Sequence, residues 1–131
     1  MTRRRISTVL AGAAALAVAA ACFSDHAPTA PAVNADCNVA PGATPDGNAV
    51  VQIRNFSFLP GTVQVKSGGT VTWINCEVAG TPSHTTHNDA GVWSSGLLAP
   101  GQGFTHTFAA AGSFAYHCEP HPFMTGSVTV Q

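Results

Sequence analysis

The chain has 131 residues, of which 45% are hydrophobic and only 8% are charged, and its formal net charge is −1 with neutral histidines. This length allows one small domain rather than two once an N-terminal leader and a linker are set aside. Outside the first five residues the chain has no cluster of lysine or arginine, which excludes the basic surface that nucleic-acid binding requires.

Residues 1–21 have the composition of an export signal. Three consecutive arginines at positions 3–5 precede an apolar, alanine-rich run at residues 9–21. A basic segment followed by a short apolar segment is typical of secretory signal peptides. The apolar run is too short to cross a bilayer as a helix, which argues against an N-terminal membrane anchor. We therefore expect residues 1–21 to be a signal peptide and the mature protein to be exported.

The end of this segment, Ala19-Ala20-Ala21-Cys22, resembles a bacterial lipobox, in which small residues precede a cysteine that becomes the lipidated first residue. Ala19 stands where such a motif usually has leucine, so ordinary cleavage after Ala21 is the alternative. The sequence thus predicts a periplasmic protein, or one anchored through lipid on Cys22 at the outer side of the bacterial cytoplasmic membrane or at the outer membrane.

Residues 22–48 are mainly alanine, proline, asparagine, aspartate and glycine, with few side chains that could enter a core. This composition predicts a flexible tether and leaves residues 49–131 as the folded domain. Without residues 1–21, Arg54 and Lys66 stand against six acidic residues, which gives a net charge of −4 with neutral histidines. Because charges are so sparse, we expect partners to dock mainly through apolar contacts.

Short runs rich in valine, threonine, isoleucine and phenylalanine alternate with turn residues throughout the domain. This pattern predicts an all-β, antiparallel sandwich. The expected strands are residues 50–54, 62–66, 70–75, 103–108, 113–117 and 128–130. Glycine and proline break the segment between residues 76 and 104 into loops, which often carry binding residues. The two-residue period places Phe114, Tyr116 and Cys118 on one face, so the Cys118 thiol should point toward the core.

Four cysteines are present. Cys22 is the candidate lipid site and Cys118 belongs to the motif described next, which leaves Cys37 and Cys76. Exported proteins meet an oxidising compartment, in which spare thiols commonly pair. We expect a Cys37–Cys76 disulfide that ties the tether to the domain, with Cys22 as a rival partner if it carries no lipid.

The most specific motif is Cys118-x-x-His121-x-x-Met124, which places a thiolate, an imidazole and a thioether on one short loop. Soft sulfur ligands with imidazole select copper, and two histidines, one cysteine and a weak axial methionine describe an electron-transfer copper site. A single cysteine or methionine is more often core filler. Here, however, Pro120 and Pro122 stiffen the backbone around His121, and packing alone does not explain three metal-binding residues on a rigid loop.

Residues 114–130 resemble the C-terminal copper loop of the cupredoxins, the type 1 blue copper proteins of the plastocyanin, amicyanin and pseudoazurin family. The short spacing between His121 and Met124 is similar to that of the amicyanins. The likeness continues upstream through residues 71–75, 84–86 and 95–101, and it covers about residues 49–131. It implies a single cupredoxin-like Greek-key β-sandwich.

The resemblance also implies a ligand set for one type 1 copper ion, namely His84, Cys118, His121 and Met124. Cys118 would supply the thiolate, the histidines two imidazole nitrogens, and Met124 the long axial contact. Backbone N–H groups would donate hydrogen bonds to the Cys118 sulfur and tune the reduction potential. Pro120 has no N–H group and is excluded as such a donor.

The upstream histidine ligand has an alternative. In the family this histidine follows a proline directly, whereas Ser83 separates Pro82 from His84 here, and the loop after residue 75 is longer. The longer loop leaves room for His87 as the ligand. Spacing favours His84, and we expect His87 on the loop surface, where most histidines outside a site lie.

A cupredoxin of this kind would carry single electrons between redox partners in the cell envelope, and it would transform no substrate and so be no enzyme. By resemblance, a donor and an acceptor protein would dock on the monomer near His121, Pro122 and Phe123. The alternative is a copper-binding or copper-buffering envelope lipoprotein that uses the same ligands without a dedicated role in electron transfer. A zinc site is less suited, because zinc has little use for methionine.

Overall fold

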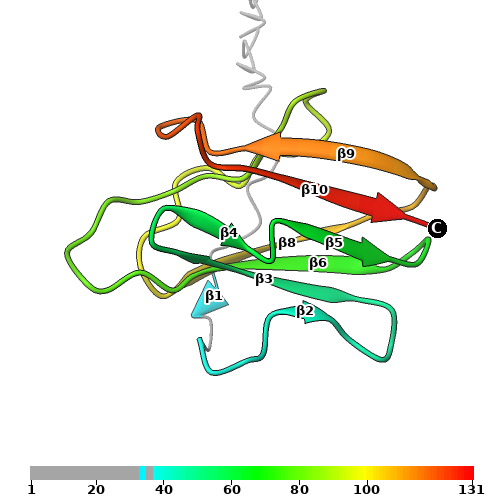
Figure 1. Ribbon diagram of the computed structural model, residues 1–131, viewed down its shortest axis with the longest axis horizontal. Helices are drawn as coiled ribbons and strands as arrows, with labels where there is room; N and C mark the ends of the chain where they lie inside the picture. Colours follow the sequence, from blue (N-terminus) through cyan, green and yellow to red (C-terminus); the bar gives the residue numbers. More distant parts are fainter. Residues whose placement is uncertain (1–32, 35–36) are drawn as a thin grey trace, which may run out of the picture.

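The structure is a computed structural model that describes residues 33–34 and 37–131 of the chain. These residues form strands in two sheets (Figure 1), the first in the order β1-β8-β6-β3-β2 with β4 paired to β3, the second in the order β5-β10-β9-β7. The strands are β1 (Val33–Asn34), β2 (Gly42–Ala43), β3 (Ala49–Arg54), β4 (Ser57–Leu59), β5 (Thr62–Val65), β6 (Thr70–Asn75), β7 (His87–Asn88), β8 (Gln102–Thr107), β9 (Gly112–His117) and β10 (Thr125–Val130). In this part of the chain no helix is long and apolar enough to cross a membrane.

The prediction of an all-β sandwich is confirmed, and each predicted strand is present with small differences at its ends. The largest difference is at β10, which begins at Thr125 rather than at residue 128. Two strand pairs depart from the predicted antiparallel pattern, because β3 is parallel to β6 and β5 is parallel to β10. Neither pair is joined by a hairpin, and a short hairpin connects only antiparallel neighbours.

Four short strands were not predicted, namely β1, β2, β4 and β7, each of two or three residues. Such segments are too short to show a two-residue period, and only their partners in the sheets define them. Two of them fall in the segment assigned to the tether: β1 pairs with β8, and β2 pairs with β3. The domain boundary at residue 49 stays a prediction.

The predicted disulfide between Cys37 and Cys76 is confirmed, with 5.6 Å between the two Cα atoms. It ties the segment before β2 to the residue that follows β6. The predicted signal peptide at residues 1–21 and the candidate lipid site at Cys22 lie outside the described residues.

Trp73 on β6 is the centre of the core between the two sheets. Its buried ring lies 5.5 Å from Trp93, 6.0 Å from Phe104 and 5.4 Å from Tyr116, measured between ring centroids. Aromatic pairs of this kind add about 0.5–1.5 kcal/mol each beyond the area they bury. Tyr116 also packs over Gly126 of β10, where a Cβ atom would lie 2.4 Å from the tyrosine ring, so only glycine fits there. Burial raises the pKa of Tyr116 to about 12, which keeps the phenol neutral.

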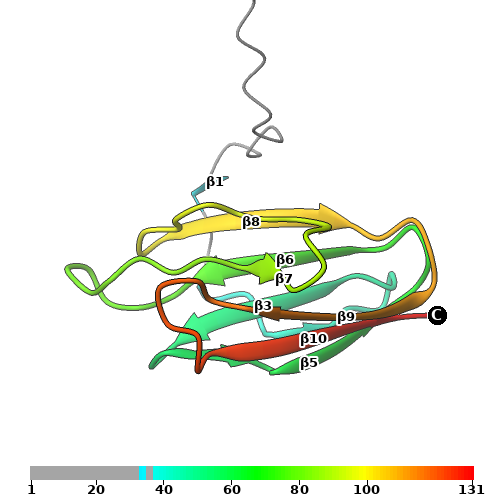
Figure 2. The same cartoon turned by 90° about the horizontal axis from the view of Figure 1, so that it is seen from above.

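One end of the sandwich collects three connections: the β3–β4 turn, the loop that follows β6, and the loop between β9 and β10 (Figures 1 and 2). The parallel strands β3 and β6 end there side by side, and β9 runs toward the same end. The Cys-x-x-His-x-x-Met motif occupies the β9–β10 loop. The fold therefore brings this motif next to loops that lie far away in the sequence.

Candidate metal centre

A cluster of three side chains lies at this end of the sandwich. His84 comes from the loop after β6, and Cys118 and His121 come from the β9–β10 loop. Their potential ligand atoms all lie within 4.8 Å of one another. The Cys118 sulfur is 3.7 Å from Nδ1 of His84 and 3.6 Å from Nδ1 of His121. His84 and Cys118 are fully buried, and His121 is half-buried, so the cluster opens to the surface on the His121 side.

Backbone hydrogen bonds close the loop that carries two members of this cluster. The N–H of Cys118 donates to the carbonyl oxygen of Met124 at 3.0 Å, which joins the two ends of the loop. Inside it, His121 donates to Cys118 at 3.2 Å and Met124 donates to His121 at 2.9 Å. Met124 is itself buried and belongs to the hydrophobic core. These backbone hydrogen bonds restrict the movement of Cys118, His121 and Met124.

His84 is held by a different device. Its N–H and C=O groups exchange hydrogen bonds of 3.0 and 2.7 Å with Leu98, whose side chain is buried. This isolated β-bridge joins the irregular segment that carries His84 to the irregular segment that carries Leu98. Glycine and proline predicted loops between residues 76 and 104, with a binding residue on one of them. The bridge to Leu98 explains how such a loop holds the side chain of His84 in a fixed position.

The structure brings His84, and not His87, to Cys118 and His121. His87 lies on β7, half-buried, with its ring 5.5 Å from the ring of His117 on the neighbouring strand. Its Nδ1 is 3.8 Å from a carboxylate oxygen of Glu119. His84 and His87 are only three residues apart, but their surroundings differ: His84 lies in the cluster and His87 packs against His117.

Thr85 contributes to the cluster, and sequence reasoning missed it. Its backbone N–H donates to the Cys118 sulfur at 3.4 Å, and its Oγ1 accepts the N–H of Glu119 at 2.8 Å. The expectation that backbone N–H groups would donate to the sulfur is met by this residue. The only signal in the sequence was its position next to His84, which does not by itself indicate a contact with a residue 33 positions away.

Glu77 faces the second nitrogen of His84. One carboxylate oxygen lies 3.6 Å from Nε2 of His84, and the same oxygen accepts the N–H of Phe56 at 2.8 Å. Burial, and after it the nearby His121, lower the pKa of His84, while Glu77 acts in the opposite direction. The neutral imidazole, which is the form that binds a metal ion, is therefore favoured in the folded chain.

The donor set suits copper. A single thiolate between two imidazole nitrogens is a soft and compact set of ligands, and burial of Cys118 keeps water away from the sulfur. Met124 offers a thioether from the loop that carries Cys118 and His121.

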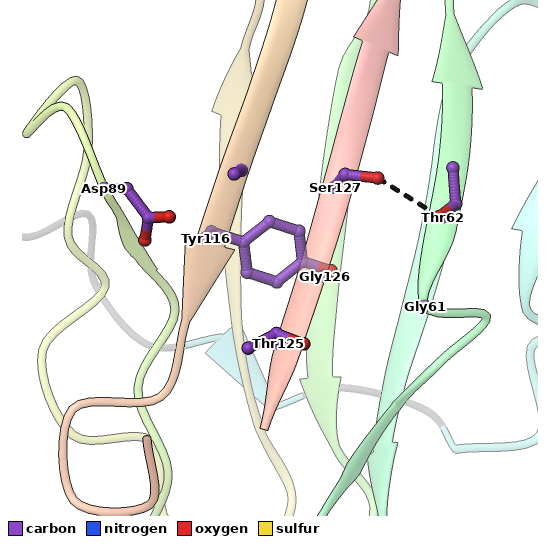
Figure 3. Close-up of a pocket in the computed structure, with 8 residues that line it drawn as sticks. Gly61, Thr62, Asp89, Tyr116, Thr125, Gly126 and Ser127 are labelled. Atoms are coloured by element: carbon purple, nitrogen blue, oxygen red, sulfur yellow. Dashed lines mark hydrogen bonds between the residues drawn. The ribbon is translucent and has the colours of Figure 1, made fainter. Parts of the chain in front are cut away.

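A separate hollow of about 560 Å³ lies over β5, β10 and β9 (Figure 3). The hydroxyl groups of Thr62 and Ser127 form a hydrogen bond of 3.1 Å beside it. Its lining residues are Gly61, Thr62, Asp89, Ala115, Tyr116, Thr125, Gly126 and Ser127. None of the three clustered side chains borders this hollow, so the candidate metal centre and this hollow are different places.

The part of the chain that contains the cluster is similar in sequence to known proteins. Residues 46–131, which include the whole cluster, match the family described as copper binding proteins of the plastocyanin/azurin family. Amicyanin of Paracoccus denitrificans is 40% identical over 91 residues, which cover 66% of this chain and 67% of that protein. Amicyanin-alpha of Methylorubrum extorquens is 34% identical over 124 residues, covering 91% and 98%. Plastocyanin of Scenedesmus fuscus is 37% identical over 86 residues, covering 56% and 86%.

The fold is also similar to solved structures of amicyanin. The structure of a reduced tryptophan-to-tyrosine mutant of amicyanin superposes with a TM-score of 0.59 at 37% identity, covering 70% of this chain and 92% of that one. The Cu(I) forms of two other amicyanin mutants each give a TM-score of 0.58, at 39% and 37% identity, covering 72% of this chain and 87% of those chains.

Proposed function

The chain belongs to the plastocyanin/azurin family of copper-binding proteins, and on that premise we propose that it carries single electrons, with one type 1 copper ion bound by His84, Cys118, His121 and Met124. Its kinship with the cupredoxins, predicted from the copper loop, is confirmed. The observation that carries the proposal is the placement of the Cys118 sulfur 3.7 and 3.6 Å from two histidine nitrogens.

Each residue has a role in this proposal. Copper, when bound, supplies a couple that gains and loses one electron. Cys118 would offer the thiolate, His84 and His121 their Nδ1 atoms, and Met124 a weakly bound thioether. The hydrogen bond from Thr85 withdraws charge from the sulfur and so adjusts the potential. The bridge from His84 to Leu98 and the closed β9–β10 loop limit how far the ligands can move between oxidation states.

We further propose that electrons enter and leave at His121, which is half-buried and is the least buried member of the cluster. Phe123 is 71% exposed, and its ring lies 6.1 Å from that of His121. Pro122 between them is also exposed. The exposed apolar surface formed by Pro122 and Phe123 suits a donor protein and an acceptor protein that dock there one after the other. A charged, hydrated surface would instead leave water between the two redox centres. The proposal assigns no catalytic step to the chain, which acts as a monomeric carrier and not as an enzyme.

The place of action that we propose is the cell envelope. The Cys37–Cys76 disulfide supports an oxidising compartment, because such bonds are rare in reducing ones. Export through residues 1–21, and attachment through lipid on Cys22, belong to this proposal. A copper-buffering lipoprotein remains the second candidate, and it would share the ligand set.

The test is an absorption spectrum and an electron self-exchange rate on the copper-loaded protein. The proposal expects an intense visible band from thiolate-to-Cu(II) charge transfer, one copper ion per chain, and rapid self-exchange. A colourless copper complex would overturn the type 1 assignment. An intense band with very slow exchange would favour the buffering protein instead.

A further inference from the structure

The β3–β4 turn has an unusual backbone for its sequence. Arg54 pairs with Ser57, which leaves Asn55 and Phe56 as a two-residue turn, and both have positive φ angles of 50° and 54°. Two-residue hairpin turns with positive φ at both positions favour asparagine at the first and glycine at the second. Asn55 fits this preference. Phe56 does not, because its Cβ atom is disfavoured in the left-handed region.

The side chain of Phe56 lies against the candidate metal centre. Its ring meets His84 edge-on at 5.2 Å and an interplanar angle of 87°, and it meets His121 edge-on at 5.0 Å and 90°. Phe56 thus contacts both imidazoles. Its ring is also 6.4 Å from that of Phe123, and 36% of the residue remains exposed.

The backbone of Phe56 reaches the same centre by a second route. Its N–H donates to a carboxylate oxygen of Glu77 at 2.8 Å, and that oxygen lies 3.6 Å from Nε2 of His84. The strained turn therefore places the Phe56 ring against His84 and, through the Phe56 N–H, holds the Glu77 carboxylate near Nε2 of the same histidine. Residues in sparsely populated backbone regions persist only where their surroundings over-determine them, and they gather at functional sites.

We propose that Phe56 is a positioning residue of the copper centre. Its ring fixes the planes of His84 and His121 against each other, and its N–H fixes Glu77 toward His84. An imidazole that contacts both an aromatic ring and a carboxylate moves little when the charge of the centre changes, which favours rapid electron exchange. This inference rests on the copper-binding function proposed above, and it adds a residue outside the ligand set and its loops.

The experiment compares Phe56→Gly with Asn55→Gly. Both variants place glycine in the left-handed region of the same turn, but only the first removes the ring. Phe56→Tyr serves as the conservative variant that keeps the aromatic edge. In each protein the visible band, the reduction potential and the self-exchange rate are measured with copper bound. Side-chain ¹³C relaxation of His84 and His121 is measured without it.

For Phe56→Gly we expect the visible band to remain, the self-exchange rate to fall several-fold, the potential to shift, and both imidazole rings to become more mobile in the metal-free protein. Asn55→Gly and Phe56→Tyr should match the wild type in every one of these measurements. Wild-type ring relaxation and exchange rate in Phe56→Gly would overturn the proposal, whatever happened to its stability. If Phe56→Gly does not fold, Phe56→Leu replaces it with the same expected results.

The outcomes separate this inference from the proposed function. Absence of a visible band in the copper-loaded wild type would reject the type 1 assignment, while the relaxation measurement on metal-free protein would still decide whether Phe56 restrains the two rings.

Discussion

Thr85 donates its backbone N–H to the Cys118 sulfur at 3.4 Å, and its hydroxyl oxygen accepts the N–H of Glu119, the residue after Cys118, at 2.8 Å. One buried threonine thus links the loop of His84 to the loop of Cys118 by two hydrogen bonds. The centre depends on these loops keeping a fixed separation, because its ligands come from both.

Replacing Thr85 by valine tests the second of these bonds. Thr85→Val keeps the shape and the N–H donor but removes the acceptor of the part-buried Glu119 N–H, a hydrogen bond that contributes about 0.5–1.5 kcal/mol. We expect a loss of this order in the free energy of unfolding of the metal-free protein, measured in urea, and a shifted reduction potential. Thr85→Ser keeps the hydroxyl and is the control; an equal loss in both variants would mean that the hydroxyl contact contributes nothing.

Cys118→Ser tests the thiolate. Serine preserves the size of the buried side chain but removes the soft ligand, so the thiolate charge-transfer band should disappear completely from the copper-loaded protein. Circular dichroism should show that the β-sandwich remains. A variant that kept the band would mean that copper binds at another cysteine.

The pair His84→Ala and His87→Ala tests the choice of the upstream ligand. His84 lies in the cluster, whereas His87 packs against His117, so the first variant should damage the visible and electron paramagnetic resonance spectra and the second should leave them nearly unchanged. The reverse result would place the ligand three residues further along the chain.

Removing the disulfide tests how the segment before β2 is held. Cys37→Ser with Cys76→Ser opens a loop with a sequence separation of 39. We expect a loss of about 2–4 kcal/mol in the free energy of unfolding, the usual range for a native crosslink. Urea unfolding of the double variant and of the oxidised wild type measures the difference. Mass spectrometry of the exported wild type should find these two cysteines linked and Cys118 outside any disulfide.

His106 makes stability depend on pH. Burial lowers the pKa of His106 in the folded chain, and its ring stacks on Trp93 at 5.1 Å. Between the ordinary imidazole pKa of about 6.5 and the lower folded value, the unfolded chain binds more protons than the folded chain. The stabilising contribution is therefore full above the unfolded pKa and is lost as pH falls through this window.

The variant that isolates this effect is His106→Gln. The difference in unfolding free energy between wild type and His106→Gln, both metal-free, should shrink as pH falls from about 7.5 to about 5.5, a span that brackets the imidazole pKa. Loss of the stacking contact alone would lower stability equally at both pH values. A difference independent of pH would thus reject the role of His106 titration.

Local sequence pattern was enough to predict the longer strands and the loop that carries Cys118, His121 and Met124. The longer strands follow from a two-residue period, which needs no partner to be visible, and Cys118, His121 and Met124 lie within seven residues, so their spacing alone placed them on one loop. The Cys37–Cys76 disulfide was expected from the roles assigned to Cys22 and Cys118, with Cys22 as a rival partner, and the structure shows that pairing. Short strands such as β2 and β7 were missed because two residues carry no period, and the parallel pairs were missed because no hairpin joins their strands.

Long-range packing decided the rest. Spacing favoured His84 but left His87 open as the ligand, and the fold, with its bridge from His84 to Leu98, places His84 beside Cys118. Thr85 and Phe56 reach the centre from loops that follow different strands, which no spacing reveals. The chain itself determined the fold class and the copper chemistry, because these depend on residue type and short spacing. Tertiary structure decided which residues surround the ligands, because that depends on where the ends of separate strands meet.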